Sequence, residues 1–235
     1  MNSFISKNYL EVFHNVEETA KASSRKINEV TLIAVSKTKP VEMLKEAYDA
    51  GARDFGENKV QEIMDKYDKL PADIRWHMIG HLQTNKVKYI ADKVFMIHSV
   101  DSVKLAKEIS KQAVKAGRTI PILIEVNIAG EDSKFGVSPA ECEQLICAIH
   151  TLPGIRINGL MTVPPYVENA EDNRQYFRAL KQLSVDIMQK NIDNVYMDFL
   201  SMGMSGDYTV AIAEGANLVR VGTNIFGERD YSVQT

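Results

Sequence analysis

Short runs of β-branched and aliphatic residues alternate along this chain with longer amphipathic stretches, and this alternation limits the possible folds more than any other feature. It is typical of repeated strand–helix units around a parallel sheet. Eight candidate strands with crossover helices can close into a barrel, although an open doubly wound sheet uses the same alternation. The count favours closure. The candidate strands are Thr31–Ser36, Asp54–Gly56, Arg75–Ile79, Val94–His98, Ile120–Asn127, Ile155–Gly159, Met197–Ser201 and Leu218–Val221.

The stretches between these strands have helical periodicity, and several begin at Pro or Asp and end near Gly. An amphipathic leading helix is expected over residues 1–27. With 235 residues, the chain has the length of one such barrel, and we expect a single α/β domain over 1–235: a (β/α)8 TIM barrel with an extra N-terminal helix. The apolar stripe of the leading helix is Tyr9, Val12, Phe13 and Val16. The other expected helices are Pro40–Ala50, Lys59–Lys69, Ser102–Ala116, Pro139–His150, Glu171–Gln189 and Tyr208–Glu214.

Composition excludes several classes of protein. The net charge of −3 offers no basic stripe, so we expect a small ligand and no nucleic acid. Two cysteines, Cys142 and Cys147, are too few and too far apart for a CxxC site or a disulfide-built secreted domain, and we expect buried thiols. The N-terminus lacks a signal-peptide pattern, and no apolar run approaches a membrane span. A cytoplasmic location without membrane contact is therefore expected.

Lys37 stands at the carboxyl end of the first, fully apolar candidate strand. Alternation puts it on the same face as Ile33 and Val35, and an interior position would surround its amine with apolar walls. Desolvation lowers the pKa of a lysine and frees the neutral amine to attack an aldehyde. A solvated surface lysine is the alternative, and position alone leaves both open. Lys39 is the weaker candidate, and for Lys134 a solvated loop charge is favoured over a place at the barrel mouth.

Two glycine-rich loops follow the last two candidate strands: residues 200–207 (LSMGMSGD) and residues 220–227 (RVGTNIFG). Converging backbone N–H groups at such loops bind anions, and barrels frequently bind phosphate after strands seven and eight. Ser205 can add its hydroxyl, beside Gly222 and Thr223. Glycines that only serve tight turns are the alternative, which the two adjacent positions disfavour. Arg220 shares a strand face with Gly222 and can donate to a ring nitrogen, which would leave a pyridine ring a weak electron sink.

Other polar residues give weaker signals. His77 and His81 have a metal-like spacing, but on a strand they lie too far apart, and we expect no metal. We favour packing for His77 and Trp76 and a polar lining of the mouth for His81. Asn58 follows the second candidate strand, where a mouth position and a simple helix cap are both open. No arrangement typical of a Ser/His/Asp or Cys/His catalytic site stands out.

Several motifs taken together resemble those of the pyridoxal phosphate homeostasis proteins, also described as proline-synthetase co-transcribed proteins. The resemblance covers nearly the whole chain. The matching segments are residues 34–40 (AVSKTKP), 55–62 (FGENKVQE), 76–86 (WHMIGHLQTNK), 98–102 (HSVDS), 133–136 (SKFG), 159–163 (GLMTV), 200–207 (LSMGMSGD) and 219–227 (VRVGTNIFG).

This resemblance implies a barrel similar to the N-terminal domain of alanine racemase, with pyridoxal 5′-phosphate (PLP) held as a Schiff base on Lys37. It assigns the phosphate to Ser205 and to the backbone of Gly222 and Thr223, and the ring nitrogen to Arg220. By the same match, the pocket-lining residues are Asn58, Ser201 and Met202.

The resemblance also implies a role in intracellular vitamin B6 balance, as a carrier or buffer of PLP that can supply PLP-dependent apoenzymes, without robust catalysis. Racemisation needs two bases, and racemases of this fold type take one from a second domain for which we expect no room here. A single-domain PLP-dependent amino-acid racemase of weak activity remains the alternative. A third possibility is an aldolase-like barrel in which Lys37 reacts with a sugar phosphate.

Overall fold

Eight parallel strands close into a barrel in the computed structural model, which describes residues 3–228. Each strand pairs with its neighbour in the sequence, and β8 pairs with β1 from Thr31 opposite Leu218 to Ala34 opposite Val221. The predicted (β/α)8 barrel is confirmed, and the ends of the predicted 1–235 domain lie outside the described residues. The strands are β1 (Thr31–Val35), β2 (Asp54–Glu57), β3 (Arg75–Met78), β4 (Met96–Val100), β5 (Ile120–Glu125), β6 (Ile155–Met161), β7 (Val195–Ser201) and β8 (Leu218–Val221).

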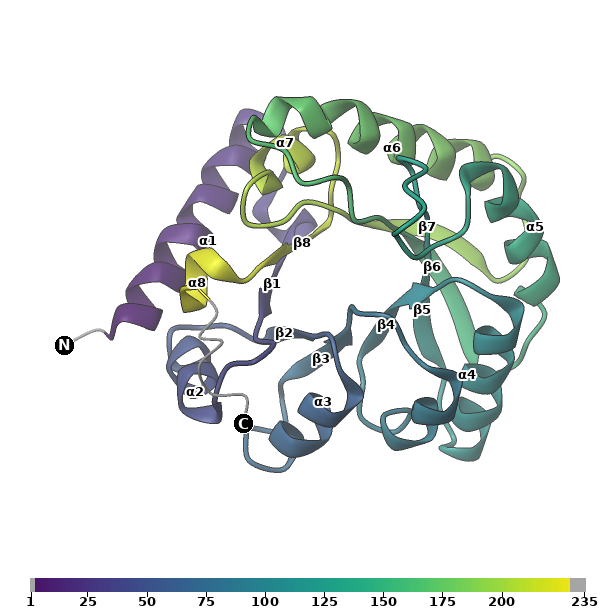
Figure 1. Cartoon of the computed structure of the whole chain (residues 1–235), viewed down its shortest axis with the longest axis horizontal. Coiled ribbons are helices and arrows are strands. Elements are labelled where there is room, and N and C mark those ends of the chain that lie inside the picture. Colours follow the sequence, from purple (N-terminus) through teal and green to yellow (C-terminus); the bar gives the residue numbers. More distant parts are fainter. Residues whose placement is uncertain (1–2, 229–235) are drawn as a thin grey trace.

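Helices surround this barrel on the outside (Figure 1). Between β3 and β4 the connection is a 3-10 helix instead of an α-helix. No helix among the described residues is long and apolar enough to cross a membrane. The α-helices are α1 (Phe4–Ala22), α2 (Val41–Asp49), α3 (Val60–Tyr67), α4 (Val103–Lys115), α5 (Pro139–Ile149), α6 (Arg174–Met188), α7 (Tyr208–Ala213) and α8 (Thr223–Phe226). The 3-10 helices are η1 (Ile27–Glu29), η2 (Thr84–Tyr89) and η3 (Ala170–Asn173).

The leading helix α1 packs against α2, α7 and α8 on the outside of the barrel (Figure 1). It compensates for α8, which has only 4 residues and cannot cover its strand alone. The helix ends at Ala22, five residues before the predicted end, because Ser24 adopts a left-handed conformation with φ of 55°. Residues 1 and 2 of the predicted helix lie outside the described part. The buried side chains of α1 are Ile5, Tyr9, Val12, Val16 and Ala20.

Several strands begin or end at other residues than predicted, because apolar residues continue past the predicted ends and do not mark them. β4 begins at Met96, two residues after the predicted start, while β7 begins at Val195, two residues before its predicted start. β6 continues past Gly159 to Met161.

Gly159 allows β6 and β7 to approach closely. At Gly159 the register shifts and φ is 152°, and a Cβ there would lie 1.8 Å from the carbonyl oxygen of Phe199. Only glycine allows the two strands to approach so closely.

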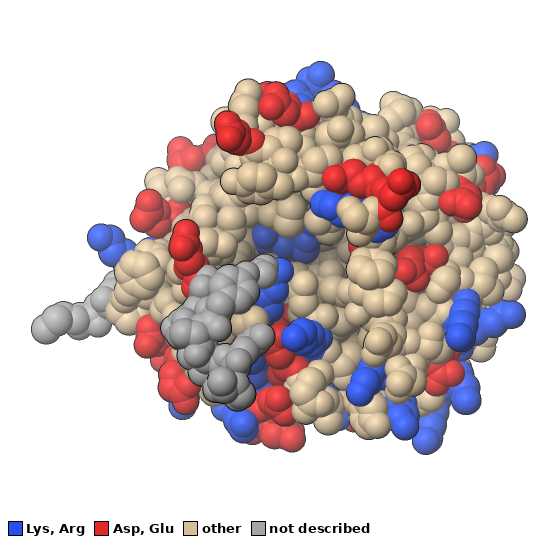
Figure 2. All heavy atoms as spheres, viewed as in Figure 1, with Lys and Arg blue, Asp and Glu red and all other residues tan. Residues whose placement is uncertain are grey.

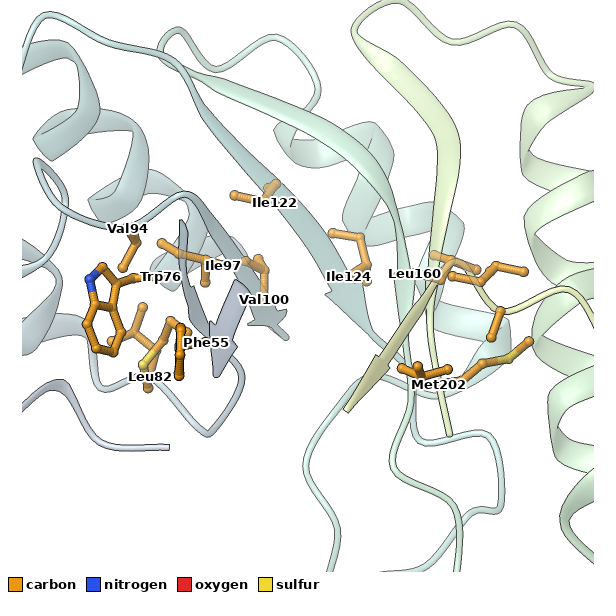
Figure 3. Packing of buried hydrophobic residues seen from close by; sticks show 14 of the residues in the cluster. Phe55, Trp76, Leu82, Val94, Ile97, Val100, Ile122, Ile124, Leu160 and Met202 are labelled. Carbon is orange, nitrogen blue, oxygen red and sulfur yellow. The ribbon is translucent and has the colours of Figure 1, made fainter. Parts of the chain in front are cut away.

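Apolar side chains form two separate clusters. The larger cluster fills the space between strands and helices and includes Trp76, whose ring centroid lies 6.0 Å from that of Phe55 (Figure 3). Packing of Trp76 in the core is thereby confirmed. Of the two thiols, Cys142 is buried, but the expectation of burial was wrong for Cys147, because it lies on the exposed face of α5. The smaller cluster lies inside the barrel and consists of Ile33, Met96, Leu123, Met161 and Leu218.

Candidate functional site

A cavity of about 650 Å³ opens where the strands end, between the segments that follow β1, β2, β3, β6, β7 and β8. Barrel enzymes place their chemistry at this end, and the volume is typical of small-molecule sites. Figure 2 shows a hollow near the middle of the molecule, with Lys and Arg atoms gathered around it. Six of the eight predicted cofactor-binding residues line the cavity. They are Lys37, Asn58, Ser205, Arg220, Gly222 and Thr223.

Lys37 occupies a turn that follows β1, and its side chain is half-buried. Val35 lines the same cavity and Ile33 lies inside the barrel, as the alternation along this strand predicted. The intervening Ser36 points the other way and is buried. The turn is held by Thr38, whose N–H donates to a carboxylate oxygen of Glu62 at 2.6 Å. The cavity position of Lys37 is therefore fixed by both the strand and the turn.

A buried ionic cluster lies behind this turn, on the outer side of the barrel. The Lys66 ammonium donates to Glu57 at 2.7 Å, to Glu62 at 3.0 Å and to the carbonyl of Ser36 at 3.0 Å. The Ser36 hydroxyl donates to the same Glu57 oxygen at 2.6 Å. Burial raises the pKa of Glu57 to about 7, against the opposing attraction of Lys66. We call these four residues the ionic cluster. It ties α3 and the end of β2 to the backbone that carries Lys37.

The loops after β7 and β8 meet at Ser205 and Gly222. The Gly222 N–H donates to Ser205 Oγ at 3.2 Å, which leaves the hydroxyl hydrogen of Ser205 available to a ligand. Within residues 3–228, the backbone N–H groups of Ser205, Gly206 and Thr223 donate to no protein acceptor. A Cβ on Gly222 would lie 3.2 Å from the Val35 carbonyl, so a small residue keeps the cradle open. These groups together fit a bound phosphate.

Asp207 stabilises the first of these two loops. Its carboxylate accepts the N–H of Met204 at 2.6 Å and the side-chain amide of Asn173 at 2.8 Å. Asn173 and Asp207 both line the cavity, and sequence reasoning missed both of them. Asn173 lies inside the predicted helix Glu171–Gln189, but the structure places it at the end of the 3-10 helix η3, before α6 begins, and only the contact of η3 with the loop identifies it.

Arg220 lies in the cavity wall and is 4% exposed. Its guanidinium donates to Ser201 Oγ at 2.5 Å and to the Thr162 carbonyl at 2.7 Å. Burial lowers the pKa of Arg220 to about 10, while Asp207 and Glu125 act in the opposite direction. The guanidinium therefore keeps its positive charge at neutral pH and presents it to the cavity.

Three predicted residues do not line the cavity. Ser201 lies behind Arg220, as its hydrogen bond shows. Met202 is fully buried in the larger apolar cluster (Figure 3). His81 stacks on Phe135 with ring centroids 4.1 Å apart and lies 3.6 Å from Asp101.

Lysines other than Lys37 have separate contacts. Lys39 lines the cavity, where its amine donates to the carbonyl of Glu228 at 2.7 Å. Lys134 lies outside the lining and donates to the carbonyl of Pro164 at 3.1 Å. Lys86 and Lys88 are exposed and lie over the ring of Tyr89. In the described part of the chain, no group of three His, Cys, Asp or Glu residues could hold a metal ion.

Comparison with known proteins identifies the family. The family model for the alanine racemase N-terminal domain matches residues 9–230. A pyridoxal phosphate homeostasis protein of Aquifex aeolicus is 46% identical over 221 residues, covering 94% of this chain and 96% of that protein. Its Pseudomonas aeruginosa counterpart is 42% identical over 232 residues, covering 97% of each. The chain belongs to the pyridoxal phosphate homeostasis protein family.

Solved structures agree with this family assignment. PipY of Synechococcus elongatus, solved with PLP bound, superposes with a TM-score of 0.79 at 35% identity, covering 91% of this chain and 100% of PipY. An alanine racemase of Clostridium difficile superposes with a TM-score of 0.74 at 14% identity, covering 95% of this chain and 57% of the racemase. The second likeness concerns the fold alone. Membership of the pyridoxal phosphate homeostasis protein family, expected from the sequence motifs, is confirmed.

Proposed function

We propose that this chain binds PLP at the cavity, as a Schiff base on Lys37, and acts in intracellular PLP homeostasis. The observation that carries the proposal is the common cavity, which brings an amine, a fixed guanidinium and an anion cradle together. The Lys37 amine supplies the nitrogen of a C=N bond to the aldehyde carbon, and the aldehyde oxygen leaves as water. Relatives named for PLP homeostasis and PipY with PLP bound support the assignment.

Each chemical part of PLP has a suitable partner. The phosphate fits the Ser205 hydroxyl and the N–H groups of Gly206 and Thr223, which donate to no acceptor among residues 3–228, because anions favour converging backbone donors. The N–H of Gly222, which was also expected to bind the phosphate, donates to Ser205 Oγ and supports the cradle through it. The pyridine nitrogen fits Arg220, which is buried and fixed at two points. Asn58 completes the lining near Lys37. The cavity residues therefore match the phosphate and the pyridine nitrogen of PLP in charge and in hydrogen bonding.

Arg220 also favours holding the cofactor over using it in catalysis. A charged guanidinium beside a pyridine nitrogen disfavours a second positive charge there, and an unprotonated ring withdraws electrons weakly. Proton removal from an amino-acid substrate is therefore poorly supported. We propose that the chain stores PLP in the cytoplasm and delivers it to PLP-dependent apoenzymes, and that any racemase activity is weak.

Borohydride reduction followed by peptide mapping tests the covalent assignment. We expect the reduced cofactor on Lys37, and we expect Lys37→Ala to lose both the label and the visible absorbance. Lys39→Ala is the matched control, since Lys39 lines the same cavity two residues further on, and it should keep the label at Lys37. A label that maps to Lys39 or Lys134 in the wild-type protein would refute the assignment.

Deuterium exchange at the Cα of alanine or serine tests the racemase alternative. We expect no exchange beyond that catalysed by free PLP at the same concentration. Exchange at enzymatic rates that disappears in Lys37→Ala would favour the racemase over the carrier.

A further inference from the structure

A chain of hydrogen-bonded polar side chains crosses the barrel interior, from the amino ends of the strands to the wall of the cavity. His98 and Arg220 each lie two residues after a member of the inner apolar cluster, Met96 and Leu218. Because side chains two residues apart on a strand share a face, both point into the barrel. All of these polar side chains are buried. We call this chain the core relay, and it consists of Asp54, His77, His98, Ser201 and Arg220.

The contacts of the core relay are short and continuous. His77 Nε2 lies 3.0 Å from an oxygen of Asp54, and His77 Nδ1 lies 2.9 Å from His98 Nε2. His98 Nδ1 lies 2.9 Å from Ser201 Oγ, which in turn accepts from Arg220 at 2.5 Å. The three contacts made by the histidines are within normal hydrogen-bond distance, and the contact between Arg220 and Ser201 is shorter. The amino end of β2 is thus connected to the cavity through side chains alone.

The two ends of the core relay have fixed roles. Arg220 is a guanidinium and can only donate. At the other end, burial of Asp54 opposes its ionisation, but hydrogen bonds from Arg75 and His77 outweigh it and lower the pKa of Asp54. Arg75 donates to both carboxylate oxygens, at 2.7 and 2.5 Å. Asp54 is therefore a carboxylate that only accepts.

These ends determine the proton positions between them. Burial lowers the pKa of His98 well below its ordinary value, with further contributions from His77 and Arg220, so His98 is neutral and carries one N–H. His77 Nε2–H donates to Asp54, which leaves His77 Nδ1 to accept from His98. His98 must then donate from Nε2 and accept at Nδ1. Ser201 consequently donates to His98 and accepts from Arg220.

If the hydrogen bonds between the two histidines and Ser201 ran in the opposite direction, one hydrogen-bonding group would stay unsatisfied. If His77 Nδ1 donated to His98 Nε2, His98 would carry its hydrogen on Nδ1 and donate to Ser201. The Ser201 oxygen would then face two donors, and its own hydrogen would have no acceptor among residues 3–228. A buried donor without a partner is costly. Every member is satisfied only when each residue donates to the next one in order from Arg220 to Asp54.

We propose that His77 and His98 are positioning residues for Arg220, which they hold through Ser201 in the orientation that donates to a pyridine nitrogen in the cavity. The inference rests on the proposed function. Ser201 and the Thr162 carbonyl fix the two terminal nitrogens of the guanidinium, so its remaining N–H groups keep one direction toward the cavity. A donor fixed before the ligand arrives loses less entropy when it binds.

Nitrogen-15 NMR of the histidine rings tests the proton positions in the wild-type protein loaded with PLP. We expect His98 as the neutral tautomer with its hydrogen on Nε2, and His77 with a hydrogen on the Nε2 that faces Asp54. A hydrogen on Nδ1 of His98, or a charged His98 at neutral pH, would overturn the proposal. This measurement needs no variant and is therefore independent of folding defects.

Substitution of His98 tests the consequence for the cofactor. We expect His98→Leu to change the absorbance spectrum of bound PLP and to release PLP to alkaline phosphatase about tenfold faster, because Arg220 loses its fixed partner. Met96→Ala is the matched control, since Met96 is on the same strand face but outside the core relay. It should leave the spectrum unchanged and release PLP within about twofold of the wild-type rate.

A double variant separates this proposal from the proposed function. If the core relay acts through Arg220, His98→Leu should add nothing to the release rate of Arg220→Gln, whereas independent addition of the two effects would refute the inference. An Arg220→Gln protein with unchanged spectrum and release would instead refute the placement of the ring nitrogen. A changed Arg220→Gln protein beside an unchanged His98→Leu protein refutes the core relay alone.

Discussion

Two buried polar systems support the two chemically active sides of the cavity, and they are built differently. The ionic cluster behind Lys37 lies outside the barrel and joins opposite charges over short distances, as in the 2.7 Å contact of Lys66 with Glu57. The core relay behind Arg220 lies inside the barrel and passes hydrogen bonds through imidazole and hydroxyl side chains. The first fixes a backbone turn, whereas the second fixes one side chain.

The difference has an energetic consequence. Removal of one partner from a buried ion pair leaves an uncompensated charge and costs about 3–5 kcal/mol. Removal of a neutral link leaves an unpaired donor or acceptor and costs about 1–3 kcal/mol. We therefore expect the lysine side of the cavity to depend more on its support than the arginine side does.

Lys66→Met should have the largest effect. We expect a loss of about 3–5 kcal/mol in the free energy of unfolding, because Glu57 would stay buried without its partner. Capture of PLP should also weaken, since Ser36 and Glu62 lose the ammonium that ties them to the turn. Urea unfolding and PLP titration measure the two effects. The exposed Lys69 provides the control, and Lys69→Met should change the free energy of unfolding by less than about 0.5 kcal/mol. A stable Lys66→Met protein would remove the energetic distinction between the two systems.

Ser201→Ala should have the next largest effect. It leaves an N–H of Arg220 and the Nδ1 of His98 without partners, at an expected cost of about 1–3 kcal/mol. Ser99 offers a matched control on β4, because it is buried and its Oγ finds no hydrogen-bond partner in the described part of the chain, residues 3–228. Ser99→Ala should be neutral or slightly stabilising in the same urea unfolding experiment. Equal losses for both serines would mean that the Ser201 bonds contribute nothing specific.

The residues that line the cavity could be predicted from the sequence, whereas those that support them could not. Period-two alternation placed Ile33, Val35 and Lys37 correctly, and the positions of the glycine-rich loops after the last two strands predicted that Ser205 and Gly222 line one cavity. The predicted β4 was two residues out of place, yet its interior face was right because a shift of two preserves the alternation.

The supporting residues could not be predicted in the same way. His98 and Ser201 are 103 residues apart, and their contact depends on the register of strands on different parts of the barrel. Alternation gives the face of a strand but not its height relative to other strands. Lys66 was hidden for another reason: a lysine within an amphipathic helix is normally solvated, and only the buried Glu57 opposite it makes this one different.

Glu125 adds a pH-dependent contribution to stability on the arginine side, with the same sign as that of Glu57 on the lysine side. Burial, with a contribution from Asp101, raises the pKa of Glu125 from 4.5 to about 7, against the opposing effect of Arg220. Between these pH values the folded protein binds a proton that the unfolded chain has lost, so stability falls as the pH rises from 5 to 7. Glu125→Gln should remove about 2 kcal/mol of this dependence between pH 5 and 7, because one pKa unit corresponds to about 1.4 kcal/mol, as measured by urea unfolding at several pH values. The exposed Glu143 is the control, and Glu143→Gln should keep the wild-type slope.

Arg75→Met should have the smallest effect and tests how far the core relay depends on its outer end. The Arg75 side chain is 48% exposed, so water screens its ion pair with Asp54 and the expected loss of stability is about 0–1 kcal/mol. Asp54 would keep its bond from His77, so the proton positions and the spectrum of bound PLP should stay as in the wild type. A spectral change as large as that of His98→Leu would show that Arg75 belongs to the core relay. An unchanged spectrum would place the end of the core relay at Asp54, whose carboxylate alone then fixes the direction of the hydrogen bonds.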